Sequence, residues 1–146
     1  MRTTTTTSID GLAELERRLM GFGPEIATKL GQAATRRAMK SVAEPALRSA
    51  TPIGPRADGT KVGRRIHTKI RTAIRVKKGR SKVANSVVTI ITTGRAFHAI
   101  FIERGTVKMP AQPFAQQAIE GAAQRILDAL GVELGKGIDR YVRRNP

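Results

Sequence analysis

The sequence of 146 residues predicts a single α+β domain, in which N-terminal helices and a C-terminal helix pack on an antiparallel β-sheet of three to four strands with a long basic hairpin or loop. Two changes of period predict this class. Apolar residues recur every three or four positions up to residue 47, β-branched residues dominate residues 66–103, and helical spacing returns after residue 113. We expect residues 1–8 to be a flexible segment, residues 9–130 to form the domain, and residues 131–146 to be a weak helix or a C-terminal tail.

Two helices are predicted in the N-terminal third. Ser8 or Asp10 can cap the first, and the glycines of residues 21–23 end it. Pro24 suits the first turn of the second helix, whose apolar stripe consists mostly of small residues and would allow a neighbour to approach closely. Pro45 should kink or end this helix, although the helical register continues a little further.

Three strands are predicted after the loop of residues 51–63. Over residues 66–76 the even positions hold Ile, Thr or Val and most odd positions hold cations, which indicates a strand with one covered and one cationic face. A helix is the competing interpretation, because Val62, Ile66, Ile70 and Ile74 are four apart, but the threonines favour the strand. Residues 83–93 and 96–103 give the second and third strands, the third with Phe97, Ala99 and Phe101 on one side.

The charge of the chain bears on its partners. Lys and Arg number 27 against 11 Asp and Glu, which gives a net charge of +16. Between Arg56 and Lys82 the only acid is Asp58. We interpret this region as a surface that meets nucleic acid or an acidic protein, with a solvated cationic face as the alternative.

Composition and motifs argue against several other classes. The chain has no cysteine, and therefore no disulfide, thiolate nucleophile or cysteine-ligated zinc. No segment reads as a signal peptide or reaches the ~20 apolar residues that span a bilayer, so we expect a soluble protein in a reducing, cytoplasm-like space.

Residues for catalysis do not converge in the sequence. His98 and Glu103 fall on opposite faces of one predicted strand, and His67 stands among cations. No HExxH, GxSxG or P-loop pattern occurs. We expect no enzyme, no catalytic residues, no metal and no cofactor. Motifs for reading DNA sequence are also missing, although the cationic face could bind phosphates.

Residues 96–119, AFHAIFIERGTVKMPAQPFAQQAI, resemble a signature of the tail-completion, or head–tail joining, proteins of long-tailed phages, which are minor tail proteins of the neck. In that pattern a strand ends in Glu, turns at Gly-Thr, and runs through Met-Pro-Ala-x-Pro-Phe into a helix. GLAELERRL at residues 11–19 is similar to the family's opening helix, and ATPIGPR at residues 50–56 to its entry to the first strand. The chain departs from the pattern at Arg104 and at residues 115–117.

The signature residues also suit a well-built corner between a strand and a helix, and this reading is compatible with the resemblance. Gly105 can take a positive φ, Thr106 can hydrogen-bond within the turn, and Phe114 can enter the core. Pro110 and Pro113 hold an extended connection. The full set is Phe101, Glu103, Gly105, Thr106, Met109, Pro110, Ala111, Pro113 and Phe114.

The resemblance implies a non-enzymatic virion protein, made in the host cytoplasm, that forms a ring, expected to be a hexamer, at the head-proximal end of the tail. Its implied partners are further copies of itself, the head–tail connector or stopper protein, the tail tube or tail terminator protein, and the passing genomic DNA. No membrane and no small-molecule substrate is implied. The alternative is a basic nucleic-acid-binding protein that acts by non-specific phosphate contacts.

Contacts with a subunit, the connector or DNA are expected from the cations of the long basic loop and hairpin. These candidates are Arg56, Lys61, Arg64, Arg65, Lys69, Arg71, Arg75, Lys77, Lys78, Arg80 and Lys82.

Overall fold

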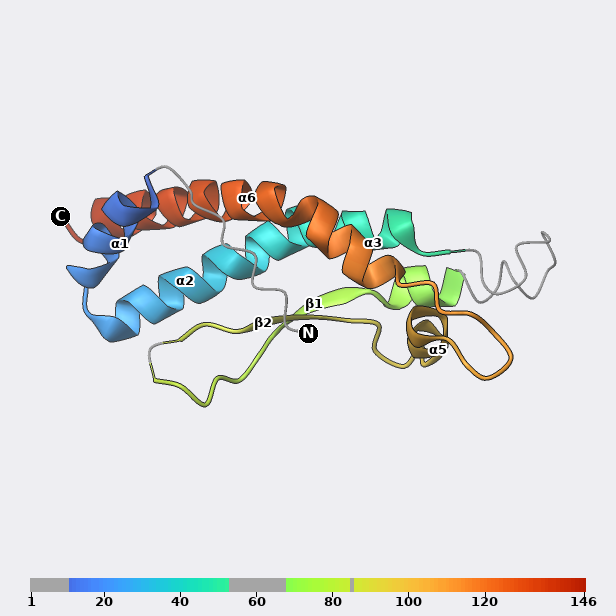
Figure 1. Ribbon diagram of the computed structural model, residues 1–146. Helices are drawn as coiled ribbons and strands as arrows, with labels where there is room; N and C mark the ends of the chain where they lie inside the picture. Colours follow the sequence, from blue (N-terminus) through green and yellow to red (C-terminus); the bar gives the residue numbers. More distant parts are fainter. Residues whose placement is uncertain (1–10, 53–67, 85) are drawn as a thin grey trace.

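Two long antiparallel helical rods form the frame of the protein (Figure 1). The computed structural model describes residues 11–52, 68–84 and 86–146. One rod is α2 (Pro24–Ala38), which continues through a π-helical turn, η1 (Met39–Ala43), into α3 (Glu44–Ala50). The other rod is α6 (Phe114–Arg144), which packs along the whole of the first.

The rods approach closely because the residues between them are small. Ala34, Ala38 and Ala43 are buried on the first rod, and Ala122 is buried on α6. The small-residue stripe predicted for the second helix therefore lies where α6 packs. Gly131, Gly135 and Gly137 are accommodated within α6, so residues 131–144 form a helix rather than a tail.

The N-terminal helix folds back onto one end of this frame. α1 (Leu12–Met20) ends at Gly21, Gly23 turns the chain at φ 84°, and Pro24 begins α2. Leu15, Leu19, Phe22, Leu30 and Leu130 pack there against the buried residues Ala34, Leu134 and Ile138. The end of the first helix and the start of the second agree with the sequence prediction. The N-cap of α1 is Gly11, without a side-chain cap, and the predicted caps Ser8 and Asp10 lie outside the described residues.

The chain stays helical through Pro45. Proline has no N–H to donate, and the π-helical turn immediately before it absorbs the break. α3 then continues to Ala50, and Leu47 is buried. The helix does not end at Pro45, and it continues a little further, as the sequence predicted.

A two-stranded antiparallel sheet lies against α2, on the side away from α6 (Figure 1). β1 (Arg75–Lys78) pairs with β2 (Thr89–Thr92), and Val76 lies opposite Ile91. Gln32 of α2 anchors the hairpin, because its Nε2 donates to Val88 O and Thr89 Oγ1, both at 3.2 Å. Within the described residues the sheet has these two strands, not the three to four predicted.

The prediction of one strand over residues 66–76 was wrong where the structure describes it. Residues 68–73 are helical, and strand β1 starts only at Arg75. Ile70 and Ile74 are almost completely buried, whereas Thr68 and Thr72 are exposed. The spacing of four was therefore the true signal, and Thr72 Oγ1 donates to Thr68 O at 2.8 Å, as helical threonines do.

The predicted third strand is a helix. α5 (His98–Arg104) buries Ala99 and Ile102, and Ala96 is buried just before it. These positions are three apart, which suits a helix packed by one face. Together with Leu47, Ile70, Ile74 and Phe114 they form the second core of the protein, where α3, α5 and the start of α6 meet.

Candidate interaction surface

A carboxylate from α5 caps the start of α6. Both oxygens of Glu103 accept hydrogen bonds from backbone N–H groups, from Ala115 at 2.9 Å and from Gln116 at 3.1 Å. The first N–H groups of a helix have no partner within the helix, and the helix dipole favours negative charge there. Glu103 thus ties the end of one helix to the start of the next.

The turn between α5 and α6 depends on Gly105. Its φ is 74°, and a Cβ built on it would lie 2.6 Å from the backbone nitrogen of Ala111. Thr106 and Met109 exchange two backbone hydrogen bonds, of 2.8 and 3.1 Å, so that Val107 is fully exposed at the tip. The N–H of Lys108 also donates to Thr106 Oγ1 at 3.3 Å.

The chain then returns to α5 before α6 begins. The N–H of Gln112 donates to Ile102 O at 2.8 Å. Pro110 and Ala111 are exposed, while Met109 packs against the core. Pro113 precedes Phe114, which begins α6 and is buried. The residues of the phage-like signature therefore build a corner between two helices, whereas the sequence predicted a corner between a strand and a helix.

The apolar outer face of α5 faces solvent. Phe97, Ile100 and Phe101 are 59, 56 and 48% exposed. The rings of Phe97 and Phe101 meet edge to face, with centroids 6.1 Å apart and planes at 85°. Two of the four phenylalanines of the chain are thus exposed on the surface. We call these three residues the α5 patch.

The cations predicted as an interface are exposed on one connected segment. We call this set the basic hairpin; it includes Lys69 and Arg71 of the short helix over residues 68–73 that leads into β1. Its members are Lys69, Arg71, Arg75, Lys77, Lys78, Arg80 and Lys82, all of them exposed. None of the seven has an ion pair within the described part of the chain. Arg56, Lys61, Arg64 and Arg65 lie outside the described residues.

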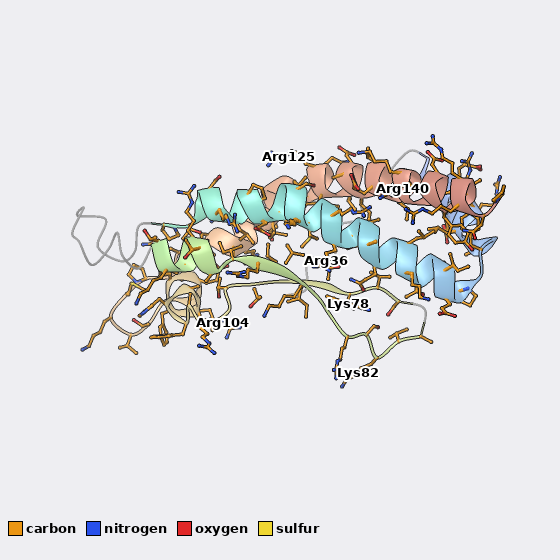
Figure 2. All side chains as sticks on the ribbon, turned by 180° about the vertical axis from the view of Figure 1, so that it is seen from behind. Arg36, Lys78, Lys82, Arg104, Arg125 and Arg140 are labelled. Atoms are coloured by element: carbon orange, nitrogen blue, oxygen red, sulfur yellow. The ribbon has the colours of Figure 1, made fainter. Side chains whose placement is uncertain are left out.

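The basic hairpin and α6 lie on opposite sides of α2. Figure 2 shows Lys78 on the hairpin and Lys82 on the loop beyond it, with α2 between them and α6. α5 follows the hairpin directly in the chain, because β2 ends at Thr92 and α5 begins at His98. The α5 patch and the basic hairpin therefore belong to one continuous stretch of chain that leaves the helical frame.

The candidate catalytic groups do not come together. The ring of His98 packs on Phe97, with centroids 4.0 Å apart, and both oxygens of Glu103 are occupied by α6. Within residues 11–52, 68–84 and 86–146, no cluster of three His, Cys, Asp or Glu side chains could hold a metal ion. His67 lies outside these ranges.

The sequence pattern did not indicate that Phe97 and Ile100 are exposed. Alternation placed Phe97 on the same side as Ala99, but the structure buries Ala99 and exposes Phe97. The spacing of Ala96, Ala99 and Ile102 was the available signal, since small and apolar residues three apart indicate one buried helical face.

Comparisons with known proteins add no relative. The chain matches no family model, no curated protein and no solved structure. Among the described helices, none combines the length and the apolar character needed to cross a membrane.

Proposed function

We propose that this protein is a structural component of a phage neck, which forms a ring at the head-proximal end of the tail, completes the tail and joins it to the head connector. The observation that carries the proposal is the α5 patch, which lies beside a corner built from residues that resemble the tail-completion signature. In this proposal the protein acts through its interfaces and catalyses no reaction.

The α5 patch has the composition of a protein-binding surface. Aromatic residues are enriched at protein–protein interfaces, and an exposed apolar cluster marks such a site more reliably than isolated apolar residues do. Ile100 and Phe101 project from a short helix, and Phe97 immediately precedes it; the other face of this helix is fixed in the core through Ala99 and Ile102. A rigid support of this kind lowers the entropy lost on binding.

The basic hairpin supplies the second half of the proposed interface. Seven exposed cations without ion pairs within the described chain would attract an acidic surface of the connector, the tail tube or terminator protein, or the DNA that passes through the ring. Copies that each carry +16 repel one another. Ring formation, expected to be sixfold, would therefore need the tail or connector as a template.

The same hairpin favours a second candidate function. Cations without protein partners can neutralise phosphates, and a protein that binds DNA non-specifically needs little more than this. In that case the protein acts away from the virion, and the α5 patch has no obligatory partner. The two functions differ in whether the protein is part of the finished particle.

The test is particle assembly with two variants and a control. One variant reverses three charges of the basic hairpin, Arg71→Glu, Arg75→Glu and Lys77→Glu; the other, Phe97→Ser with Phe101→Ser, removes the aromatic part of the α5 patch. The control reverses three exposed cations elsewhere, Arg17→Glu, Lys40→Glu and Arg125→Glu.

The proposal expects both test variants to leave full heads separate from finished tails, while the control assembles normal particles and all melting curves stay close to that of the wild type. Surface changes of this kind alter stability by about 0.5 kcal/mol each or less. Normal particles from both test variants would refute the proposed interface.

A further inference from the structure

A cationic hollow lies between α2 and α6, near the C-terminal end of α6. It has a volume of about 200 Å³. Its apolar floor includes Leu30, Ala34 and Gly137, and its rim carries Arg37, Arg140 and Arg144. An adjoining depression shares Arg37 and Arg140 and adds Lys136 and Arg143.

Charge in this region is unbalanced. The two depressions together hold five cations and two carboxylates, Glu133 and Asp139. Glu133 is already engaged, with its carboxylate oxygens 3.8 Å from Arg37 Nη1 and 3.2 Å from Lys136 Nζ. Within the part of the chain that the structure describes, Arg140, Arg143 and Arg144 have no ion pair. The two depressions therefore keep a positive charge that would attract an anion.

Arg140 is held in position to receive such an anion. Its Nε donates to the backbone oxygen of Lys136 at 3.1 Å, which fixes the side chain along the helix. Its two terminal nitrogens have no hydrogen-bond partner among the described residues. A guanidinium that is already oriented loses less entropy when it binds an oxyanion.

The helix dipole explains only part of this arrangement. Cations in the last turn of α6 are favoured by the partial negative charge at its C-terminus. Arg37 is not placed by a helix end, because α2 continues through η1 into α3; it contacts Glu133 of α6 at 3.8 Å. Its guanidinium also contributes to the rim from the opposite helix.

We propose that this hollow binds the phosphodiester backbone of DNA, at a site separate from the basic hairpin. Arginine suits phosphate, because its planar fork donates two parallel hydrogen bonds to one oxyanion. Arg140 and Arg144 are one helical turn apart, about 6 Å along the axis, so they can contact neighbouring phosphates on one strand. Figure 2 shows Arg140 on α6, with α2 between it and the labelled lysines of the hairpin. The site does not depend on the neck assignment.

The test measures how binding of a 20-base-pair duplex of mixed sequence depends on salt, using the full chain. The variant is Arg37→Gln, Arg140→Gln and Arg144→Gln. A matched control removes the same charge at exposed cations outside the hollow, Arg36→Gln, Lys40→Gln and Arg125→Gln. Figure 2 shows Arg36 on the hairpin side of α2 and Arg125 further along α6 from Arg140.

The slope of log K against log salt is negative, and each lost phosphate contact reduces its magnitude by about 0.9. We expect the hollow variant to lose about 2 to 3 in slope and the control to lose less than about 1. Equal losses would show that only net charge matters and would overturn the proposal.

Two further measurements use the wild-type protein. The first does not depend on the folding of a variant, and the second distinguishes DNA from an acidic protein as the ligand. Hydrogen exchange of the wild-type protein with the duplex should slow in residues 137–144, and unchanged exchange there would also overturn the proposal. Polyglutamate of the same total charge should bind more weakly than the duplex at equal salt. If polyglutamate binds as tightly and protects the same residues, the site recognises acidic protein and the DNA assignment is wrong.

Discussion

Removing the Glu103 carboxylate should weaken the junction between α5 and α6. Its two oxygens accept the N–H groups of Ala115 and Gln116, and both groups would lose their protein partner in Glu103→Ala. Water can replace part of this, because Gln116 is exposed and Glu103 is only half-buried. The start of the longest helix in the described chain would then be less well capped.

The expected cost follows from capping measurements and hydrogen-bond energetics. Replacing a capping side chain by alanine costs about 0.5–2 kcal/mol, and a hydrogen bond to a charged group contributes about 1.5–3 kcal/mol. For two bonds at a partly solvated site we expect a loss of about 2 kcal/mol in Glu103→Ala. Glu103→Gln keeps one acceptor oxygen but no charge, and should lose about 1 kcal/mol.

Urea denaturation at pH 7 measures these losses, with Glu120→Ala as the control. Glu120 is exposed on α6 and accepts a hydrogen bond only from the side chain of Gln116, so its loss should cost about 0.5 kcal/mol or less. Both alanine variants change the net charge equally. For a chain of this size the Glu103→Ala loss corresponds to a Tm lower by about 6–8 °C. If Glu103→Ala and Glu120→Ala were equally stable, the capping role would be refuted.

Further predictions concern the turn, the solution state, local stability and pH. Gly105→Ala should cost about 3 kcal/mol or more, because φ 74° is strained for alanine and the new Cβ meets backbone atoms; a loss below about 1 kcal/mol in urea would show that the turn adapts. Sedimentation of the free protein should give a monomer at low salt, and a stable closed ring there would contradict the need for a template. Hydrogen exchange should be slow in residues 70–74, which include two core isoleucines, and fast in the exposed residues 80–84; the reverse order would mean that the core is misplaced. The hydrogen bond to Lys29 lowers the pKa of Glu25 from its ordinary value of 4.5. The pair therefore stabilises the fold at pH values above 4.5, and this stabilisation is lost as the pH falls through the lowered pKa. Lys29→Gln should bring the Glu25 pKa measured by NMR back toward 4.5, and an unchanged pKa would exclude the pair in solution.

The helical frame was predictable from sequence because its signals are local. Glycines at residues 21 and 23 followed by Pro24 end one helix and start the next through backbone preferences alone. The stripe of small residues likewise predicts a close helix neighbour without identifying it. That neighbour, α6, became known only from the structure, together with its continuation past three glycines to Arg144.

The strand prediction over residues 66–76 failed because the sequence satisfies two periods at once. Isoleucines four apart also fall on alternate positions, and threonines between them strengthen the apparent strand. Tertiary packing decides the outcome, since Ile70 and Ile74 share a core with Leu47 and Phe114, which lie far away in the chain. A period of two over such a short range contained no information about these contacts.

The exposure of the cations on the candidate surface could be predicted from sequence, whereas the exposure of its aromatic residues could not. The run of cations with almost no acids indicated exposure directly, and the seven described members are exposed. Alternation placed Phe97 and Phe101 on one side of a predicted strand, and it did not indicate whether that side is buried or exposed. Their exposure depends on which face of α5 packs against the core. The small residues Ala96 and Ala99 lie on the buried face, so the two phenylalanines face solvent.

The most direct test of the central claim is electron cryomicroscopy of the neck of intact tailed particles that are assembled in the presence of this protein. We predict a closed ring between the connector and the tail tube whose subunits fit α2 and α6 as paired rods, with the α5 patch buried against a neighbouring chain. A particle whose neck contains no copy of this protein, while the protein is found bound to DNA outside the virion, would contradict the account.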